Sequence, residues 1–577
     1  MMKPLYTPWG ETLDRTDPLP EYPRPQLRRE SYMSLNGVWN YTVCDSEEYS
    51  RRNTGKIVVP FSPESLLSGC DFQLQPGETL WYERFFTLPA GFVKERVLLH
   101  FGAVDQSARV LVNDCPVGGH EGGYLPFTLD ITAALRQGVN RLTVAVTDRT
   151  DDGPHTYGKQ KLKRGGIWYT AQSGIWQTVW LESVPQTYIR GLKITPLFDG
   201  GAVEVRAHLS APAAGEAIVH CGETVVARAM LSAAGVCRLS LTDFHPWSPE
   251  DPFLYDLTVT AGDDRVESYF GMRKFSVVEW QGHRVMALNG HPYFQHGLLD
   301  QGYWSDGLYT PPSDEAMIWD IRTVKALGFN MLRKHIKIEP LRWYYHCDRL
   351  GMIVWQDLVS GGDEFHSLYT QALPFAGVHV KDRPSHRLGR GDPAGRAQFE
   401  KDLTDTMRLL YNCTSLALWT PFNEGWGQFD ALRLSDRIRA LDPTRLIDHA
   451  SGWHDQGGGD LKSRHIYYRP VKLKNDGRRV LALTEFGGYS LPLAGHCATD
   501  RRFGYRIYEN QDSWMAAVEQ LYEKEIIPLI KDRGLSATVY TQLSDVEDEV
   551  NGLVTFDRRG CKADVGRFQA IAEKLRF

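Results

Sequence analysis

Two glutamates in this sequence each follow a short apolar segment with the length of a β-strand. Glu424 comes after residues 416–420, and Glu485 comes after residues 480–483. Cleavage of a glycosidic bond needs two carboxyl groups that flank the bond, one protonated and one ionised. A single glutamate at a strand end is more often a helix cap or the partner of an arginine. Two of them, each with glycine close behind, predict a catalytic pair that acts on glycosides.

The residues around the pair suggest how the two roles divide. Asn423 is placed to donate a hydrogen bond to the sugar hydroxyl at C2, an interaction that strengthens in the transition state. Glu424 would then face the leaving oxygen as the acid. Tyr467 ends an apolar segment between the two glutamates. Its hydroxyl could bond to Glu485 and keep that carboxyl ionised.

Further polar side chains follow other apolar segments and are candidates for the same pocket. Arg333 is expected to orient Glu485 through a charge-assisted hydrogen bond. His335 and Lys337, just after it, either face the pocket or belong to a solvated loop, and Lys337 in the pocket would favour an acidic sugar. The other candidate substrate-binding residues are His296, Asp300, Asp357 and Trp453.

Residues 277–577 carry the elements that must position these side chains. Strand candidates, most of them alternating with helical segments, lie at residues 293–299, 329–333, 352–355, 416–420, 446–449, 465–468, 480–484 and 537–541. This alternation predicts a (β/α)8 TIM barrel with a loop-rich insertion, and active-site residues of such barrels stand at the carboxyl ends of the strands. A doubly wound open sheet fits less well, because no glycine-rich phosphate loop follows any strand.

Two all-β units are expected before the barrel. Residues 1–185 consist of short alternating segments broken by Gly, Pro, Asn and Asp, which is typical of a β-sandwich. Residues 186–276 contain a second, smaller set of strand candidates, whose total length suits an immunoglobulin-like sandwich. The chain is therefore predicted to have three domains.

The composition excludes several classes of protein. Hydrophobic residues make up 42% and charged residues 24% of the chain, which is ordinary for globular domains. The formal net charge of −6 argues against a nucleic-acid partner. No apolar stretch is long enough to span a membrane, and residues 1–22 lack the apolar core of a signal peptide. We therefore expect a cytoplasmic protein with no membrane partner.

The cysteines and histidines give no sign of a metal or a cofactor. The chain has nine cysteines and no CxxC motif, which favours free thiols in a reducing compartment. His366, His379 and His386 lack the spacing of metal ligands on one element, so no metal site is predicted. The oligomeric state is open, with a homo-oligomer among the alternatives.

Several motifs occur in an order that is informative over nearly the whole chain. They lie at residues 22–27 (YPRPQL), 35–39 (LNGVW), 122–127 (GGYLPF), 173–177 (SGIWQ), 330–333 (NMLR), 423–424 (NE) and 484–487 (TEFG). With these motifs the chain resembles glycoside hydrolase family 2, the family of β-galactosidases, β-glucuronidases and β-mannosidases.

The resemblance implies a fold and a mechanism. The fold would be a jelly-roll, sugar-binding type of β-sandwich, an immunoglobulin-like sandwich and a catalytic TIM barrel. The mechanism would be retaining, with Glu485 attacking the anomeric carbon and Glu424 serving first as the acid and then as the base. Retention requires the two carboxyl groups to lie about 5–5.5 Å apart.

The sequence also departs from parts of the family. The β-glucuronidases carry an Asn-x-Lys motif that holds the substrate carboxylate, whereas the nearest segment here reads Asn551-Gly552-Leu553. Asp357 stands where the large β-galactosidases carry a metal-ligating glutamate, and the chain is far shorter than those enzymes. These departures favour a neutral sugar and leave a magnesium requirement unsupported.

We therefore expect a retaining exo-β-glycosidase whose partner is a carbohydrate substrate, with a β-galactosidase-like specificity as the first choice. A β-hexuronidase acting on galacturonides or glucuronides comes next. A catalytically inactive carbohydrate-binding protein is a rival of another class, although both glutamates are present. A metal-dependent hydrolase on the same barrel would need a cluster of His and Asp at the strand ends, which the sequence does not show.

Overall fold

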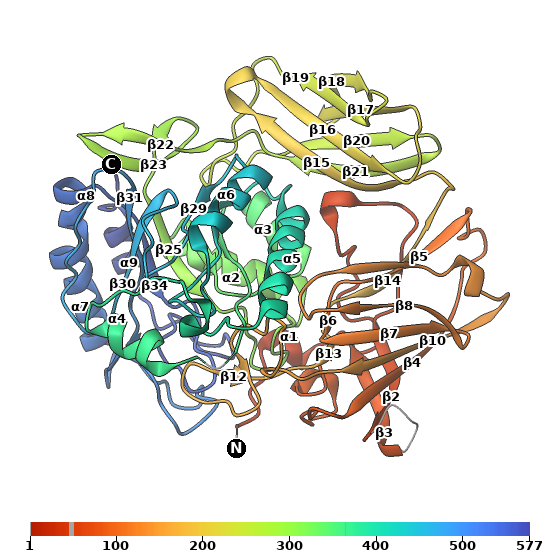
Figure 1. Ribbon diagram of the computed structural model, residues 1–577, viewed down its shortest axis with the longest axis horizontal. Helices are drawn as coiled ribbons and strands as arrows, with labels where there is room; N and C mark the ends of the chain where they lie inside the picture. Colours follow the sequence, from red (N-terminus) through yellow and green to blue (C-terminus); the bar gives the residue numbers. More distant parts are fainter. Residues whose placement is uncertain (1, 46–50, 364) are drawn as a thin grey trace.

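A computed structural model describes residues 2–45, 51–363 and 365–577 of the chain. Figure 1 shows three units: a β-sandwich from the first part of the chain, a second sandwich beside it, and a barrel formed by the last part. This arrangement confirms the predicted multidomain fold.

The first sandwich consists of two antiparallel sheets with the core between them. One sheet has the strand order β3-β2-β4-β10-β7-β8 and the other β1-β14-β5-β9. Alternate side chains of β2 (Gly37–Cys44) are buried, and Trp39, Tyr41 and Val43 enter the core. The remaining strands are β1 (Met33–Ser34), β3 (Arg51–Val59), β4 (Thr79–Thr87), β5 (Arg96–Phe101), β7 (Ser107–Val112), β8 (Cys115–Glu121), β9 (Phe127–Asp130), β10 (Val139–Thr147) and β14 (Val179–Val184).

The second sandwich is immunoglobulin-like and packs its two sheets around a smaller core. A 3-stranded sheet, β15-β16-β19, faces a 4-stranded sheet, β18-β17-β20-β21. The buried faces meet at Val205, Val219, Leu257 and Val259. The strands are β15 (Ile189–Leu197), β16 (Ala202–Leu209), β17 (Gly215–Cys221), β18 (Thr224–Met230), β19 (Val236–Ser240), β20 (Tyr255–Ala261) and β21 (Asp264–Phe270).

The barrel is an 8-stranded parallel sheet with the order β29-β28-β27-β26-β25-β34-β31-β30. Its strands are β25 (Gln295–Asp300), β26 (Met331–Lys334), β27 (Ile353–Asp357), β28 (Leu416–Thr420), β29 (Leu446–Ile447), β30 (Leu461–Ile466), β31 (Val480–Gly487) and β34 (Leu535–Thr541). The sixth strand begins four residues earlier than predicted. Its alternating burial places Ser463 and His465 on the buried face, and Tyr467 lies just beyond its end.

Helices surround the barrel, and several of them begin at a residue whose side chain caps the helix. The Ser313 hydroxyl accepts a bond from the backbone N–H of Ala316 at the start of α2 (Asp314–Ala326), as the sequence predicts. The other helices longer than one turn are α3 (Leu341–Leu350), α5 (Pro393–Leu410), α6 (Ala431–Leu441), α7 (Gln511–Leu521), α8 (Ile527–Arg533) and α9 (Val565–Ala572). Among the described residues no helix has the length and apolar character needed to cross a membrane.

The amino end of the barrel is closed by a hairpin, which leaves the carboxyl end for a site. β22 (Phe275–Trp280) and β23 (His283–Leu288) form this hairpin. Met286 and Leu288 pack in one cluster with Met331, Ile353 and Trp355 of the barrel interior. The insertion between β27 and α5 lies at the opposite end, where Tyr369 and Val380 bond to His454 in the loop after β29.

Candidate active site

The barrel brings the two glutamates together at the carboxyl ends of β28 and β31. Glu485 lies within β31, and Glu424 lies in the loop after β28. One oxygen of each carboxyl lies within 4.8 Å of the other, and both residues are buried. The backbone of Glu424 has a φ of 51°, an uncommon conformation for this residue type, and its N–H donates to Ser451 O. The backbone conformation of Glu424 and its bond to Ser451 thus fix the direction of the Glu424 side chain.

Arg333 forms hydrogen bonds with several other residues of the site. Its Nη1 donates to Glu485 Oε1 at 3.0 Å, and its Nε donates to Asp357 Oδ1 at 3.0 Å. Its Nη2 donates to Asn423 Oδ1 at 2.8 Å. A planar guanidinium can hold several acceptors in one plane, which a lysine ammonium cannot. Arg333, predicted from sequence to orient Glu485, is therefore in direct contact with it.

Tyr467 holds the other oxygen of Glu485. Its hydroxyl donates to Oε2, the contact that the sequence suggested, and its ring stacks on Tyr505 with centroids 3.7 Å apart. Gly488 permits this stack, since a Cβ there would lie 2.3 Å from the Tyr505 ring. The glycines after Glu485 thus make room for the aromatic rings of Tyr540 and Tyr505.

His465 is a site residue that the sequence analysis did not select. Its Nδ1 lies 2.8 Å from Glu424 Oε1 and 3.6 Å from Glu485 Oε2. Burial lowers the pKa of the imidazole to about 3, so the ring is neutral. A neutral ring between the two carboxyls can hydrogen-bond to Glu424 without adding a positive charge to the site. The signal in the sequence was its position two residues before Tyr467.

Burial also sets the protonation of Glu424. It raises the pKa of this carboxyl to about 7, so the acid is protonated below about pH 7. Glu549 raises the pKa further, while the positive charges of Lys159 and Arg333 lower it. A raised pKa suits the role of acid that the sequence analysis gave to Glu424.

We expect kcat/KM for an unactivated substrate to fall as the pH rises through about 7, because Glu424 must be protonated to donate and its pKa is about 7. The measurement is the pH profile of the wild-type protein on an unactivated substrate, compared with that of Glu424→Gln on a substrate with a good leaving group, which the variant can still cleave. The alkaline limb should be absent in the variant. An unchanged limb in the variant would show that another group is the acid.

Two buried nitrogens near the pair have no hydrogen-bond partner within the described residues. They are Asn423 Nδ2, which is a donor, and His335 Nε2, which is an acceptor because the neutral ring donates through Nδ1 to Gln301 Oε1. His335 Nε2 lies 3.9 Å from both Asp357 Oδ2 and Glu485 Oε1, and its Nδ1 is occupied by Gln301. A free donor and a free acceptor beside a carboxyl pair are both suited to bind sugar hydroxyls, which can donate and accept. Asn423, His335 and Asp357 therefore lie beside the pair, and their part in substrate binding stays a prediction.

Trp453 also lies at this end of the barrel, next to the pair. Its ring centroid lies 6.3 Å from that of His465, which contacts Glu424. Phe375 of the insertion packs edge-on against it at 5.4 Å. The proposed stacking of Trp453 on a sugar stays a prediction.

Two predicted sugar contacts are wrong, because side chains alternate along β25. His296 Nε2 lies 3.0 Å from the Tyr522 hydroxyl, and its ring stacks on Phe329, on the helix-facing side of the strand. Asp300 has the same orientation, and its carboxylate accepts a bond from Lys334 at 2.6 Å. Both side chains therefore point away from the carboxyl pair.

Lys337 is also directed away from the pair. Its Nζ donates to Gly302 O at 2.6 Å, to Tyr309 O at 2.8 Å and to Glu339 Oε1 at 2.9 Å. The side chain is fully buried in this network. It therefore does not line the pocket, and because it is buried it does not belong to a solvated loop either.

The first sandwich contributes a second group that the strand-end pattern missed. The segment with β11 (Gln160–Lys161) and β12 (Tyr169–Thr170) leaves the sandwich and lies against the barrel (Figure 1). The ring of Trp168 lies 5.2 Å from that of Trp426, which follows Glu424 closely. The Tyr169 hydroxyl bonds to Glu549. One wall of the site therefore comes from another domain.

The absence of a metal stays a prediction. One ligand atom each of Glu424, His465 and Glu485 could meet at a common ion, since these atoms lie within 4.8 Å of one another. Glu485, however, is already bonded by Arg333 and Tyr467. Asp357 is ion-paired with Arg333 at 2.9 Å. Within the described residues, the carboxylates of Glu485 and Asp357 are thus already bonded to Arg333, and that of Glu485 also to Tyr467.

Comparison with known proteins gives matches along most of the chain. Three family profiles match: "Glycosyl hydrolases family 2, sugar binding domain" at residues 71–185, "Glycosyl hydrolases family 2" at residues 187–273, and "Glycosyl hydrolases family 2, TIM barrel domain" at residues 285–472. A beta-galactosidase of Halalkalibacterium halodurans is 23% identical over 519 residues, which are 83% of this chain and 47% of that protein. The chain spans about half the length of the curated relatives it matches.

Solved structures share the fold over nearly the full length of both chains. A beta-D-glucuronidase of Dictyoglomus thermophilum superposes with a TM-score of 0.74 at 17% identity, covering 96% of this chain and 98% of that one. A GH2 beta-galacturonidase of Eisenbergiella tayi, bound to galacturonate, gives a TM-score of 0.70 at 18% identity, with 96% and 98% covered. At this identity the likeness shows the fold alone.

Proposed function

Because the chain belongs to glycosyl hydrolase family 2, we propose that it is a retaining exo-β-glycosidase that removes terminal β-linked sugars from small glycosides or oligosaccharides. The observation that carries the proposal is the buried carboxyl pair. Its oxygens approach within 4.8 Å, which suits direct attack by one carboxylate better than attack by an intervening water. An inverting pair would need about 6.5–9.5 Å.

In the first step Glu485 attacks the anomeric carbon while Glu424 protonates the leaving oxygen. Arg333 and Tyr467 each bond to one oxygen of Glu485, which fixes the carboxylate for attack. Glu424, with its pKa near 7, holds the proton that the leaving group needs. The bond from Glu485 to the sugar forms as the bond to the aglycone breaks.

In the second step water releases the sugar from Glu485. Glu424 has lost its proton and now takes one from the attacking water, so the same residue serves as base. His465 at 2.8 Å keeps the carboxyl in place in both states. Two inversions at the anomeric carbon give a product with the configuration of the substrate.

The proposal also concerns which terminal sugar the enzyme removes. A neutral, β-galactosidase-like substrate is the first candidate from sequence, since residue 553 is leucine and Lys337 bonds elsewhere. A β-hexuronide is the second candidate, and a buried lysine from the first sandwich favours it. Relatives and structural neighbours carry the names beta-galactosidase, beta-glucuronidase and beta-galacturonidase, so both candidates have precedents.

The test is a panel of p-nitrophenyl β-glycosides that includes the galactoside, the galacturonide, the glucuronide and the mannoside. We expect at least one to be hydrolysed, with the β-anomer of the sugar as the first product seen by NMR. Binding of these sugars without any hydrolysis would instead support the inactive carbohydrate-binding protein. A first product of the α configuration would contradict the retaining mechanism.

A further inference from the structure

One lysine at the active site differs from the other buried lysines of the described chain. Lys334 pairs with Asp300 at 2.6 Å, Lys337 with Glu339 at 2.9 Å, and Lys562 with Asp545 at 2.5 Å. Lys159, only 5% exposed, makes no ion pair with any described residue. An ammonium group taken out of water without a counter-charge is costly, so such groups are rare unless they have a function.

The surroundings of Lys159 are polar and aromatic. Its Nζ lies 3.5 Å from the Tyr169 hydroxyl and 5.1 Å from the centre of the Tyr169 ring. It also lies 5.9 Å from the centre of the Trp426 ring. The Tyr169 hydroxyl also bonds to Glu549, so a buried carboxylate reaches the ammonium group only through this hydroxyl. Two aromatic faces stabilise a cation in part, but they do not neutralise it. No described carboxylate makes an ion pair with the ammonium group, which can therefore still pair with an anion.

Lys159 lies close to the carboxyl pair. Trp426, which it overlies, comes two residues after Glu424, and the ring of Trp426 lies 6.4 Å from that of His335. The positive charge of Lys159 lowers the pKa values of both Glu424 and His335. His335 in turn approaches Glu485 to 3.9 Å. The ammonium group is thus near enough to act on a charge carried by a sugar bound at the pair.

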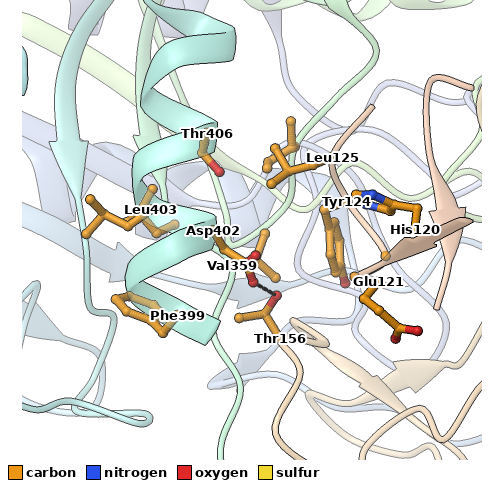
Figure 2. A pocket seen from close by; sticks show the side chains of 14 residues that line it. His120, Glu121, Tyr124, Leu125, Thr156, Val359, Phe399, Asp402, Leu403 and Thr406 are labelled. Carbon is orange, nitrogen blue, oxygen red and sulfur yellow. Dashed lines mark hydrogen bonds between the residues drawn. The ribbon is translucent and has the colours of Figure 1, made fainter. Parts of the chain in front are cut away.

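The segment that carries Lys159 is fixed to the barrel just before it. A small cavity of about 10 Å³ lies where the first sandwich meets α5. Among the side chains that line it, Thr156 bonds to Asp402 (Figure 2), at a distance of 3.1 Å. The N–H groups of Tyr157 and Gly158 both donate to Ser360 O, at 3.0 and 2.9 Å. Lys159 is therefore held by neighbours on both domains, as a specific binding group must be.

We propose that Lys159 binds the carboxylate of the terminal sugar, so that the substrates of this enzyme are β-hexuronides. This inference rests on the proposed glycosidase function. Lys159 takes the place of the lysine that β-glucuronidases carry in their Asn-x-Lys motif, where this chain has Leu553, and of Lys337, which is bonded to Glu339. The anchor comes from the first sandwich, more than 250 residues away from Glu424 in sequence.

The experiment compares Lys159→Gln with wild type on the p-nitrophenyl β-galacturonide, β-glucuronide and β-galactoside. We expect wild type to prefer one uronide by at least about tenfold in kcat/KM, since a charged hydrogen bond contributes about ten- to a hundred-fold in binding. The variant should lose that preference while its rate on the galactoside changes by less than about threefold. Rates are taken below pH 7, where the acid keeps its proton. Lys163→Gln, a charge change at an exposed position of the same segment, is the matched control.

Several outcomes would overturn the inference. Equal losses on uronides and galactoside would mean that Lys159 acts through Glu424 or through the fold. Cleavage of the galactoside with no preference for a uronide would leave the glycosidase function standing and refute only the role of Lys159. Preference for a neutral glycoside with a carboxylated aglycone would place the anion on the leaving group.

A wild-type measurement keeps the inference testable if the variant fails to fold. Free galacturonate or glucuronate should inhibit the wild-type enzyme at least about tenfold more strongly than galactose or glucose. Equal inhibition by the acidic and the neutral sugars would refute the carboxylate anchor. If the wild-type protein cleaves no glycoside at all, both the proposed function and the carboxylate anchor are refuted.

Discussion

Replacement of Glu485 by alanine should abolish turnover. The carboxylate that attacks the anomeric carbon is then missing, and removal of a nucleophile from other hydrolases costs about 10⁶-fold in kcat. The removed side chain also leaves space beside Arg333 and Tyr467, which normally bind its two oxygens. Azide should enter this space and attack in place of the carboxylate. The product should be a glycosyl azide with inverted configuration, detected by NMR.

The conservative variant Glu485→Gln provides the control for this result. It keeps the shape of the side chain but cannot attack, so it should be inactive and should not respond to azide. Thermal unfolding of both variants shows whether the barrel has folded. Near-normal activity of Glu485→Ala, in a folded protein and without azide, would show that another group is the nucleophile.

Replacement of Glu424 by alanine should have a different signature. General acid–base catalysis contributes about 10²–10⁴-fold, and we expect a loss of that size on substrates with poor leaving groups. Aryl glycosides with good leaving groups need little protonation, so their first step should be spared and the sugar should accumulate on Glu485. Stopped-flow release of the phenol should show a burst followed by a slow steady rate.

Azide again distinguishes the roles of the two residues. In Glu424→Ala it should attack the sugar on Glu485 and give a glycosyl azide with retained configuration, the opposite of the Glu485→Ala product. Equal losses on good and poor leaving groups would contradict Glu424 as the acid. An azide product of inverted configuration from Glu424→Ala would exchange the two assignments.

The catalytic pair could be predicted because its signal is local. Glu424 and Glu485 each follow an apolar strand, and parallel barrel strands bring their carboxyl ends to one mouth. Arg333 and Tyr467 could be predicted for the same reason. Their contacts with Glu485 follow from strand order, since Arg333 lies in β26 and Tyr467 is the first residue after β30.

Residues whose side-chain direction depends on strand register were harder to predict. His296 and Asp300 were expected in the pocket, but both lie on the helix-facing side of β25. A shift of one residue in a strand reverses the face of every side chain, and an apolar segment alone does not fix that register. His465 was missed because its strand begins at Leu461 and not at residue 465.

The wall from the first sandwich had no signal that sequence reasoning could use. Lys159 and Tyr169 lie in a segment with few regular elements, and neither apolar periodicity nor a motif connects them with the barrel. Their place follows from domain packing, in which Thr156 and Gly158 bond to barrel residues. Contacts between domains depend on tertiary structure and are invisible to local patterns.

The most direct test of the account is to identify the residue that carries the sugar. A 2-deoxy-2-fluoro derivative of the cleaved aryl glycoside, with a good leaving group, should trap the glycosyl-enzyme, because the fluorine slows its hydrolysis. Peptide mass spectrometry of the trapped protein should then find one sugar, attached at Glu485, and Glu485→Ala should take up none. A sugar attached at Glu424 or at any other residue, or hydrolysis with inversion and no trapped sugar, would contradict the account.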